Sequence, residues 1–472
     1  MNGNTTMIIA VGVVIVMVAA GVGAFMVLNR DKDSSTEIDA ALEVYGNANG
    51  DYKIDESDVE IIKKVKNGEE GYTLEKYPLA DAYKDDVIDD KDIEQVNKII
   101  AGGNSDGTQM TVWVINHTTD TTNYANGQYP TEVKWPVKKC IANGAANALI
   151  IYEIVGIKDN IAGINYNKSS PPDKIVYADY LAKPNLSPTS NSTNYLDETP
   201  VKDCVQENPE VSCVLTADNK NYLNGDKGMS EEYIKTTLKL DVVRIEHAAV
   251  DPDEYASAIL TVGFLFQKST RAEEAAEWIT DVFKTIEDKT SGLSEKTRVA
   301  ATSYYNYLSA RNSDYADVVV QAGGQYSLWA GTKSTIYFEN TSSATADPNV
   351  LLPQNQPDVI IALRTSGFLG SGASWYGSED DWKPATMNSH LEHFMVFECY
   401  KNKKVYTVSG DMPIVARVLY SAAIMYPDLI TMDFANEKHQ EFVDKFLGGA
   451  YNVSEHRFVL SQSDVEALKP AA

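Results

Sequence analysis

Short apolar runs alternate with amphipathic stretches from Gly107 onward, and this alternation predicts the elements of the body of the protein. Apolar runs bounded by turn residues favour strands, whereas apolar positions that recur every three or four residues favour helices. Strands that alternate with helices in this way predict an α/β lobe with a parallel sheet. The predicted strands of this part are TVWVIN, VKKCIA and NIAGIN, the further apolar runs are PEVSCVLTA and LDVVRIEH, and GAANALIIYEIVG is a predicted helix.

A long amphipathic helix is predicted in mid-chain, within STRAEEAAEWITDVFKTIEDKTSG. Thr270 and Glu273 have the spacing of a capping box at its start, and Gly292 lies just past its end. After this helix the α/β pattern restarts with DYADVVVQAGG, PDVIIALRTSG and KKVYTVSG, followed by two helical stretches. The apolar face of the helix consists of Ala275, Trp278, Ile279, Val282, Phe283 and Ile286, and the acidic face of Glu273, Glu274, Glu277, Asp281 and Glu287.

Residues 7–28 form an apolar run of 22 residues without a charged side chain. At 1.5 Å per residue a helix of this length spans about 33 Å, which is enough to cross the hydrocarbon core of a bilayer. The run is long for the core of a signal peptide and has no basic segment before it. We therefore expect a transmembrane anchor in residues 1–30, with a cleaved signal sequence as the alternative.

Oxygen-bearing side chains stand at alternate positions in GNANGDYKIDESDVEIIKK, and a helical pattern follows them. Counted from Asn47, they have the ligand spacing of a twelve-residue calcium loop that runs into its exiting helix. We refer to residues 47–58 as loop 1. The glycine usual at position 6 is replaced by Tyr52, and the alternative is a polar turn before a helix. The predicted ligands are the side chains of Asn47, Asn49, Asp51, Asp55 and Asp58 and the carbonyl of Lys53.

The stretch ADAYKDDVIDDKDIEQVNKII repeats this pattern 34 residues later, and we refer to residues 81–92 as loop 2. Tyr83 takes the place of a side-chain ligand, so loop 2 is expected to bind calcium more weakly than loop 1. The helix after each loop is expected to start on the capping aspartate Asp58 or Asp92 and to stop at a glycine. The predicted ligands are the side chains of Asp81, Asp85, Asp89 and Asp92 and the carbonyl of Val87.

Paired loops that end in aspartate, each followed only by its exiting helix, resemble a dockerin-like module. The resemblance covers residues 39–103, where 17 acidic residues and 8 lysines give a net charge of −9. A segment with this charge repels itself unless divalent cations bind. The resemblance implies a small all-α module in residues 31–103 that binds Ca²⁺ and docks a cohesin-like surface partner.

The net charge of −26 argues against nucleic-acid binding, which needs clustered positive charge. Calcium loops of moderate affinity suit external calcium concentrations, so we expect an extracellular body. Asn-x-Ser/Thr sequons such as the one at Asn116 give weak support. Cys204 and Cys213 are near enough in sequence to form a disulfide, whereas Cys140 and Cys399 are expected to be buried thiols.

The order of lobe, long helix and lobe over residues 142–448 resembles the cobalamin and iron-siderophore class of substrate-binding proteins of ABC importers. The order and spacing of several phrases carry the resemblance. They are NGAANALIIYEIVGIKDNIAGIN, NPEVSCVL, ILTVGFLFQKSTRAEEAAEWI, QPDVIIAL, LYSAAIMYPDLI and FVDKFLG. The resemblance implies two Rossmann-like α/β lobes, residues 104–265 and 293–472, joined by one long helix, residues 266–292. It further implies a ligand in the cleft between the lobes, and a membrane permease and ATPase as partners.

In open α/β sheets, ligands bind beyond the carboxyl ends of the strands, so the residues that follow the predicted strands are the candidates. Aromatic walls suit a corrin, a porphyrin or a catecholate. Arg364 can pair with carboxylate or catecholate oxygens, and a bound chelate is expected to touch Trp329 and Arg364 together. Ordinary packing of the aromatics and a surface ion pair of Arg364 are the alternatives. The candidates are Asn143, Tyr180, Asp218 and His247 in the first lobe, and Tyr326, Trp329, Arg364, Trp375, Tyr376 and Asp411 in the second.

The sequence has no Ser-His-Asp order, no phosphate-cradling glycine loop and no cysteine metal cluster, so we expect no enzyme activity. The favoured function is a membrane-anchored extracellular protein that captures an iron siderophore, haem or cobalamin for an ABC importer. In that case the module is a calcium-stiffened stalk. The alternative is a calcium-dependent adhesion or scaffold protein, in which the module docks a partner and the two-lobed body has lost transport.

Overall fold

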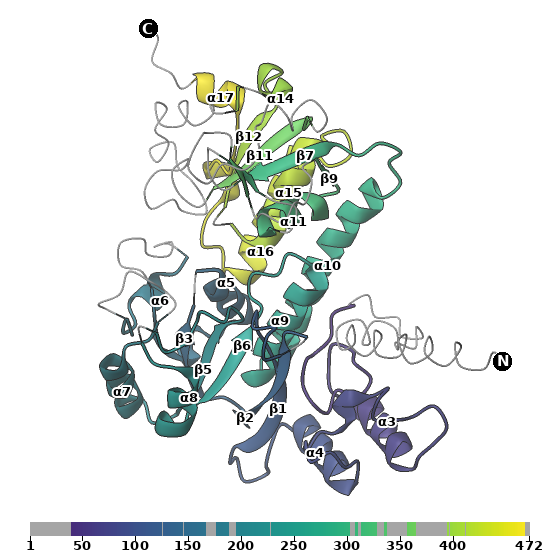
Figure 1. Cartoon of the computed structure of the whole chain (residues 1–472), viewed down its shortest axis with the longest axis vertical. Coiled ribbons are helices and arrows are strands. Elements are labelled where there is room, and N and C mark those ends of the chain that lie inside the picture. The colour runs from purple at the N-terminus through teal and green to yellow at the C-terminus, as the bar shows by residue number, and fades with distance from the viewer. Residues whose placement is uncertain are drawn as a thin grey trace, which may run out of the picture. The chain divides into compact units, whose positions relative to one another are not determined.

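The computed structural model divides into two compact units, each with its own β-sheet (Figure 1). The first unit comprises Met1–Asn165, Lys183–His247 and Asp253–Glu277, and the second comprises Tyr166–Ala182, Ala248–Pro252 and Trp278–Ala472. The structure describes residues 39–124, 126–144, 146–166, 176–187, 195–226, 228–302, 307–309, 313–327, 335–337, 356–364, 394–395, 397–410 and 412–467.

The predicted anchor, residues 7–28, lies outside the described residues. Among the helices that the structure does describe, none has the length and apolar character needed to cross a membrane.

Two helices, α3 (Glu56–Lys66) and α4 (Asp90–Ile100), lie in the module of residues 39–103 at the start of the first unit. They share a small core of buried apolar side chains, among them Ile62 and Val96. Each helix is followed by a glycine in the left-handed region, which agrees with the predicted stops. The 3₁₀ helix η1 (Pro78–Ala80) leads into loop 2.

The caps of these helices differ from the prediction. Asp55 caps α3 and Asp89 caps α4, while Asp58 and Asp92 lie one turn inside and accept a hydrogen bond from the N–H of the capping residue. The expectation that Asp58 and Asp92 begin the helices is therefore wrong by three residues. The physical reason is the capping box, in which the first aspartate binds the N–H of the third helical residue and the second aspartate completes the pair.

The module is attached to the first lobe by main-chain hydrogen bonds. The Tyr45 N–H donates to the Trp113 carbonyl at 2.9 Å, and the Ile115 N–H donates to the Glu43 carbonyl at 3.0 Å. Residues 42–45 therefore lie antiparallel to β1 (Met110–His117), with Val44 bridged to Val114. Figure 1 shows α4 beside the β1–β2 hairpin. This attachment was not predicted from the sequence.

A four-stranded parallel sheet, in the order β4-β3-β5-β6, forms the centre of the first lobe. Its strands coincide with predicted apolar runs. All residues of β5 (Val211–Ala217) are buried, and a strand that is covered on both faces does not alternate polar with apolar residues. The other strands are β3 (Lys139–Asn143), β4 (Ile161–Ile164) and β6 (Asp241–Ile245). The helices are α5 (Ala146–Val155), η2 (Lys158–Asn160), α7 (Glu198–Glu207), α8 (Glu231–Tyr233), the π-helical η3 (Ile234–Leu238) and α9 (Pro252–Leu265).

TVWVIN forms a strand, as predicted, but outside the parallel sheet. It lies in β1, which pairs antiparallel with β2 (Gln128–Trp135) as a separate hairpin. The sequence of β2 alternates buried Thr131, Val133 and Trp135 with exposed residues, a period of two that marks a half-buried strand.

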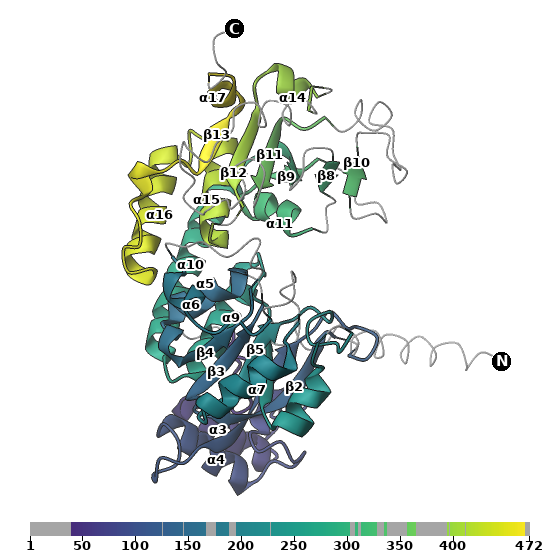
Figure 2. The ribbon, with the colours of Figure 1, turned by 90° about the vertical axis from the view of Figure 1, so that its left-hand side faces the viewer.

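A five-stranded sheet in the order β13-β12-β11-β7-β9 forms the centre of the second unit (Figure 2). All its pairs are parallel except β12 with β13. The strands are β7 (Arg298–Thr302), β9 (Gln325–Tyr326), β11 (Val359–Arg364), β12 (Val405–Ser409) and β13 (Val459–Ser461), with β8 (Tyr307–Ser309) and β10 (Thr335–Tyr337) as a separate pair. The helices are α6 (Ala178–Leu181), α11 (Asp314–Gln321), α14 (Glu398–Lys401), α15 (Ile414–Met425), α16 (Met432–Phe446), η5 (Val453–Glu455) and α17 (Gln462–Ala467).

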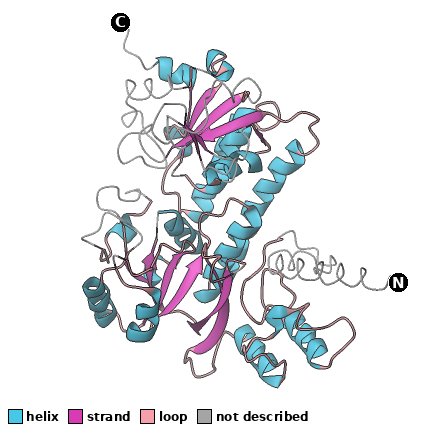
Figure 3. Ribbon diagram, viewed as in Figure 1, coloured by secondary structure: helices cyan, strands magenta, loops and turns pink. Residues whose placement is uncertain are grey.

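The predicted mid-chain helix is α10 (Ser269–Thr290), which begins in the first unit and ends in the second (Figure 3). Its predicted apolar face is buried, and four of the five predicted acidic residues are exposed, with Glu273 half-buried. Thr270 was predicted to cap this helix. The helix starts at Ser269, so Thr270 lies inside its first turn and does not cap it. The four cysteines are free and buried, so the structure has no disulfide between Cys204 and Cys213.

Candidate functional site

Three predicted candidates follow adjacent parallel strands of the first lobe. Asn143 ends β3, Asp218 follows β5, and His247 lies two residues after β6. Because β3, β5 and β6 are neighbours and run in the same direction, these residues lie together at the carboxyl end of the sheet. Their role as ligand contacts stays a prediction.

Asn143 has an oxygen that no described residue satisfies. Its Nδ2 donates to Thr216 Oγ1 at 3.0 Å, and its buried Oδ1 has no hydrogen-bond partner among the described residues. A buried amide oxygen without a partner costs free energy, and such atoms mark places where water, an ion or a ligand completes the site.

His247 is buried, and Asp218 is half-buried. Burial and, to a smaller extent, the negative charge of Glu246 together raise the pKa of the Asp218 carboxyl to about 6. The His247 ring is buried, with Nδ1 3.4 Å from the Ile245 carbonyl oxygen. The carboxyl end of the first sheet therefore has a carboxyl group, that of Asp218, with a pKa of about 6.

Tyr180 lies in a helix, so the prediction that it follows a strand is wrong, while its role as a ligand contact stays a prediction. It lies in α6, is fully buried, and meets Tyr177 edge-to-face with ring centroids 5.9 Å apart. The two rings pack against each other, which agrees with the ordinary packing alternative for this residue.

Of the ligand contacts predicted in the second unit, Tyr326 and the backbone of Arg364 lie among the described residues. Tyr326 lies in edge strand β9, and its hydroxyl is 3.3 Å from the Ala301 nitrogen and 3.4 Å from the Ala301 oxygen. Arg364 ends β11 beside Ser409 of β12, at the predicted strand end. The side chain of Arg364 and the residues Trp329, Trp375, Tyr376 and Asp411 lie outside the described structure, so the predicted joint contact of Trp329 and Arg364 stays untested.

A histidine held between two carboxylates was missed by sequence reasoning. His117, the last residue of β1, has Nε2 2.6 Å from Glu43 and Nδ1 3.3 Å from Glu246. Burial alone would lower the pKa of His117, but the two carboxylates raise it well above its ordinary value. The hydrogen bond from His117 in turn lowers the pKa of Glu246. We refer to these three residues as the His117 clamp.

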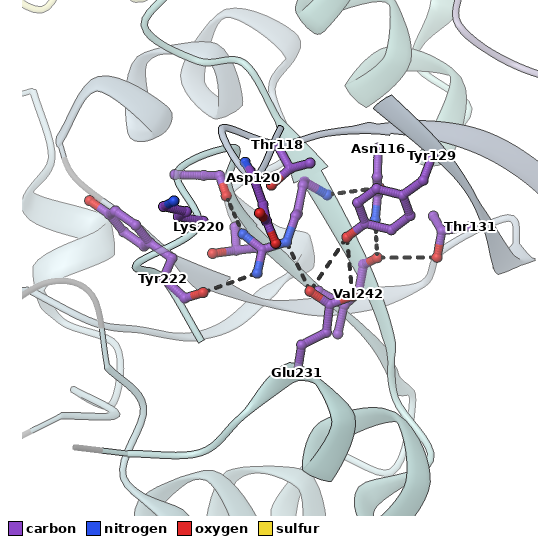
Figure 4. A network of polar contacts seen from close by, with 12 residues as sticks. Asn116, Thr118, Asp120, Tyr129, Thr131, Lys220, Tyr222, Glu231 and Val242 are labelled. Atoms are coloured by element: carbon purple, nitrogen blue, oxygen red, sulfur yellow. Dashed lines mark hydrogen bonds and ion pairs between the residues drawn. The ribbon is translucent and has the colours of Figure 1, made fainter. Parts of the chain in front are cut away.

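A second polar network joins the β1–β2 hairpin to β6 (Figure 4). The Tyr129 hydroxyl donates to Glu231 at 3.2 Å, and the buried Arg244 guanidinium donates from Nε to the same carboxylate at 2.8 Å. Asn116 donates from Nδ2 to the Val242 carbonyl at 3.0 Å and accepts from the Arg244 N–H at 2.9 Å. Both amide atoms of Asn116 are thus used in the interior, so its sequon is not an exposed glycosylation site.

Loop 1 also contains a buried oxygen without a partner. Asn47 donates from Nδ2 to the Leu42 and Asp51 carbonyls at 2.7 and 2.6 Å, and no described residue bonds its buried Oδ1. Burial raises the pKa of the nearby Asp51 carboxyl. Asn47 occupies position 1, the first ligand position of the predicted calcium loop.

The two loops close in the same way at position 12. Asp58 accepts from the N–H groups of positions 3 and 9 at 3.0 and 2.8 Å, and Asp92 does so at 2.9 and 2.9 Å. Burial raises the pKa of Asp58 to about 7. The sequence repeat is therefore a structural repeat, with equivalent hydrogen bonds in both copies.

At position 1 the loops differ, because loop 2 is satisfied from within the chain. Both carboxylate oxygens of Asp81 accept from backbone N–H groups, of Asp85 at 3.1 Å and of Asp86 at 2.9 Å. Lys91 Nζ lies 2.6 Å from Asp85, and Lys84 Nζ lies 3.8 Å from Asp81. Within the described residues, no group of three or more His, Cys, Asp or Glu side chains is arranged to hold a metal ion.

No family model matches the chain, which leaves the dockerin-like resemblance without that support, and no curated protein matches it. A solved structure, the TroA-like periplasmic binding protein FepB from Veillonella parvula, is similar with a TM-score of 0.53 and 17% identity, covering 73% of this chain and 99% of that one. An ABC transporter solute-binding protein from Sulfurospirillum deleyianum has a TM-score of 0.48 and 15% identity, with coverages of 72% and 96%. CeuE from Helicobacter pylori, with Ni(II) bound, has a TM-score of 0.48 and 16% identity, with coverages of 75% and 99%. The first likeness shows that the chain has the α/β fold of a TroA-like periplasmic binding protein.

Proposed function

We propose that this protein is the solute-binding component of an ABC importer and that its cargo is a metal chelate. The observation that carries the proposal is the pair of α/β sheets separated along the chain by α10, an arrangement similar to a periplasmic binding protein over 73% of the chain. A permease and an ATPase in the membrane are the partners that this function requires.

Residues at the strand ends supply the ligand contacts in this proposal. In the first unit, the unpaired Oδ1 of Asn143 and the edge positions of Asp218 and His247 support it. In the second unit, Arg364 stands at the end of β11, where a guanidinium suits carboxylate or catecholate oxygens. Iron siderophores, haem and cobalamin are the chelates to test.

The test is a titration of the full-length protein with ferric siderophores, haem and cobalamin, followed by tryptophan fluorescence. We expect one chelate class to bind. Arg364→Ala and Trp329→Ala should each weaken binding of that chelate roughly thirtyfold, because each removes about 2 kcal/mol of contact energy. Val320→Ala, an exposed apolar residue of α11, is the matched control. Unchanged affinity in both site variants would move the site to other loops, and no binding of any chelate would count against the proposed function.

We also propose that loop 1 binds a calcium ion. Asn47 Oδ1 fits this role, because it is a buried oxygen at a ligand position and has no partner among the described residues. When bound, the ion would add a double positive charge to a segment of net charge −9. Asn47, Asn49, Asp51, Asp55, Asp58 and the Lys53 carbonyl would hold it.

Residues 7–28 would hold the protein in the membrane with its body outside. The unbroken apolar length of the run supports this proposal. Fractionation and N-terminal sequencing test it. We expect the intact chain in the membrane fraction, and a mature chain that begins after Ala24 or later, free of the membrane fraction, would contradict it.

The adhesion alternative is less well supported. It needs a module free to dock a partner, whereas the hydrogen bonds of Glu43 and Tyr45 join this module to its own first lobe. The same contacts make the module an integral part of the first unit and replace the picture of a separate stalk.

A further inference from the structure

A cavity of about 310 Å³ lies between the module and the first lobe, within the first unit. Tyr52, Lys53 and Ile54 of loop 1 form one wall. Side chains of the lobe form the other, including Phe264 of α9 and Glu273 of α10. The cavity thus brings loop 1 beside the start of the long helix, although these segments are far apart in the sequence.

The loop wall is built from the residues that would hold the calcium ion. Asp51 supplies the side chain at position 5 and Lys53 the carbonyl at position 7, so the ion would fix the backbone on both sides of Tyr52. The Tyr52 side chain is not a ligand, and the Lys53 Nζ lies 5.6 Å from its ring centroid. An ion that orders the backbone of residues 51–53 would therefore also order the wall of the cavity that loop 1 forms.

A stacked aromatic pair and hydrogen bonds tie the lobe wall of the cavity to neighbouring elements. Trp135 of β2 stacks on Phe264 with ring centroids 5.1 Å apart and an angle of 11° between the planes. The Trp135 indole N–H also donates to the Phe264 carbonyl at 2.7 Å. A further bond, from the Ala41 N–H to Ser257 Oγ at 3.2 Å, joins the entrance of the module to α9.

Charge links the two walls as well. Glu273 is half-buried, and burial raises its pKa. The neighbouring Asp51 raises this pKa further and Lys53 lowers it. A cation bound by Asp51 would offset the negative charge that Glu273 experiences from loop 1.

We propose that calcium binding in loop 1 is transmitted through this cavity to α9 and α10, so that calcium stabilises the first lobe as well as the module. The proposal rests on the calcium site proposed above. Tyr52 and Lys53 act as positioning residues, because they line the cavity opposite the lobe while the ligand atoms of loop 1 would hold the ion.

Hydrogen exchange of the full-length protein, with calcium and with a chelator, tests this coupling. We expect calcium to slow amide exchange in loop 1, and by about threefold or more in peptides from α9 and the start of α10. Peptides from β4, which does not line the cavity, should not change. Protection confined to loop 1 would overturn the inference and leave the calcium site intact, whereas no protection in loop 1 would remove both.

Two variants distinguish the transmission to α9 and α10 from calcium binding itself. Tyr52→Ala and Lys53→Ala keep every ligand atom of loop 1, because position 7 binds through its carbonyl; Lys53→Ala also removes the 2.8 Å ion pair between Nζ and the ligand Asp55. Each should keep calcium protection in loop 1 and lose it in α9 and α10. Tyr83→Ala, which removes an exposed aromatic from loop 2, is the matched control and should behave as wild type. Protection of α9 and α10 that survives in both Tyr52→Ala and Lys53→Ala would overturn the inference.

Discussion

Loop 1 and loop 2 have the same hydrogen bonds at their closing aspartates but opposite situations at position 1. In loop 1 the Asn47 Oδ1 is buried without a partner, while in loop 2 both oxygens of Asp81 are bound by backbone N–H groups. Each loop has a lysine beside one carboxylate, with Lys53 Nζ 2.8 Å from Asp55 in loop 1 and Lys91 Nζ 2.6 Å from Asp85 in loop 2. A repeated ligand spacing therefore does not give two equal sites. At position 1, loop 1 lacks an interaction that a cation can supply, and loop 2 is already satisfied by its own backbone.

Removing a carboxylate from loop 1 should have the largest effect on calcium binding. Asp51→Ala is expected to weaken calcium binding at least about 100-fold, because it deletes a charged ligand. Asp85→Ala in loop 2 should change the tightest affinity less than about threefold. Isothermal titration calorimetry on the full-length protein measures both. Equal losses in the two variants would mean that the loops are equivalent sites.

Breaking the His117 clamp should have the next largest effect, because the clamp fixes the segment that leads into loop 1. His117→Gln leaves Glu43 and Glu246 without a charged partner and should lower the free energy of unfolding by about 2 kcal/mol at pH 7. Denaturant unfolding, with Lys284→Gln on the exposed face of α10 as the control, measures the difference.

The pH dependence of this loss follows from the direction of the two pKa shifts. The pKa of His117 is raised above 6.5 in the folded state, so its contribution is complete below pH 6.5 and is lost as the pH rises through the folded pKa. The pKa of Glu246 is lowered below 4.5, so its contribution is present above pH 4.5 and is lost in acid. We expect wild type and His117→Gln to converge in stability at alkaline pH. A difference that persists unchanged there would show that packing, rather than charge, explains the loss.

The smallest effect is expected from Lys91→Ala. Its ammonium group is exposed and pairs with Asp85, and exposed pairs of this kind contribute about 0–1 kcal/mol. The variant should lose less than about 1 kcal/mol of stability without calcium and gain weak calcium binding in loop 2. Calcium stoichiometry with Asp51→Ala as the background detects the second site. No gain there would mean that Asp81, already bound by the backbone, limits loop 2.

Features with a local period could be predicted from the sequence. The apolar face of α10 and the buried strand β5 follow from residue spacing alone, and the order of lobe, helix and lobe follows from their arrangement. The repeat of the two loops was equally visible, although the capping residues were misplaced by three positions. Strand β2 has a clear period of two and could have been found in the same way.

The contacts that were missed join residues distant in the sequence. Glu43 lies 74 residues from His117, and Asn116 lies 128 residues from Arg244. A sequon or a lone histidine does not reveal such partners, because burial of both depends on the packing of the hairpin against β6. The aromatic and arginine side chains predicted for the second unit fall largely outside the described residues, so their placement stays a prediction.

The pairing of residues 42–45 with β1 bears on how the protein can be shortened. A fragment that begins after Gly103 would look natural from the sequence, since a glycine-rich turn separates the module from the lobe. In that fragment the Trp113 carbonyl and the Ile115 N–H lose their partners, and an exposed strand edge remains. Such edges template pairing with other chains, so truncation at this boundary should favour aggregation, and a workable fragment has to begin before Leu42.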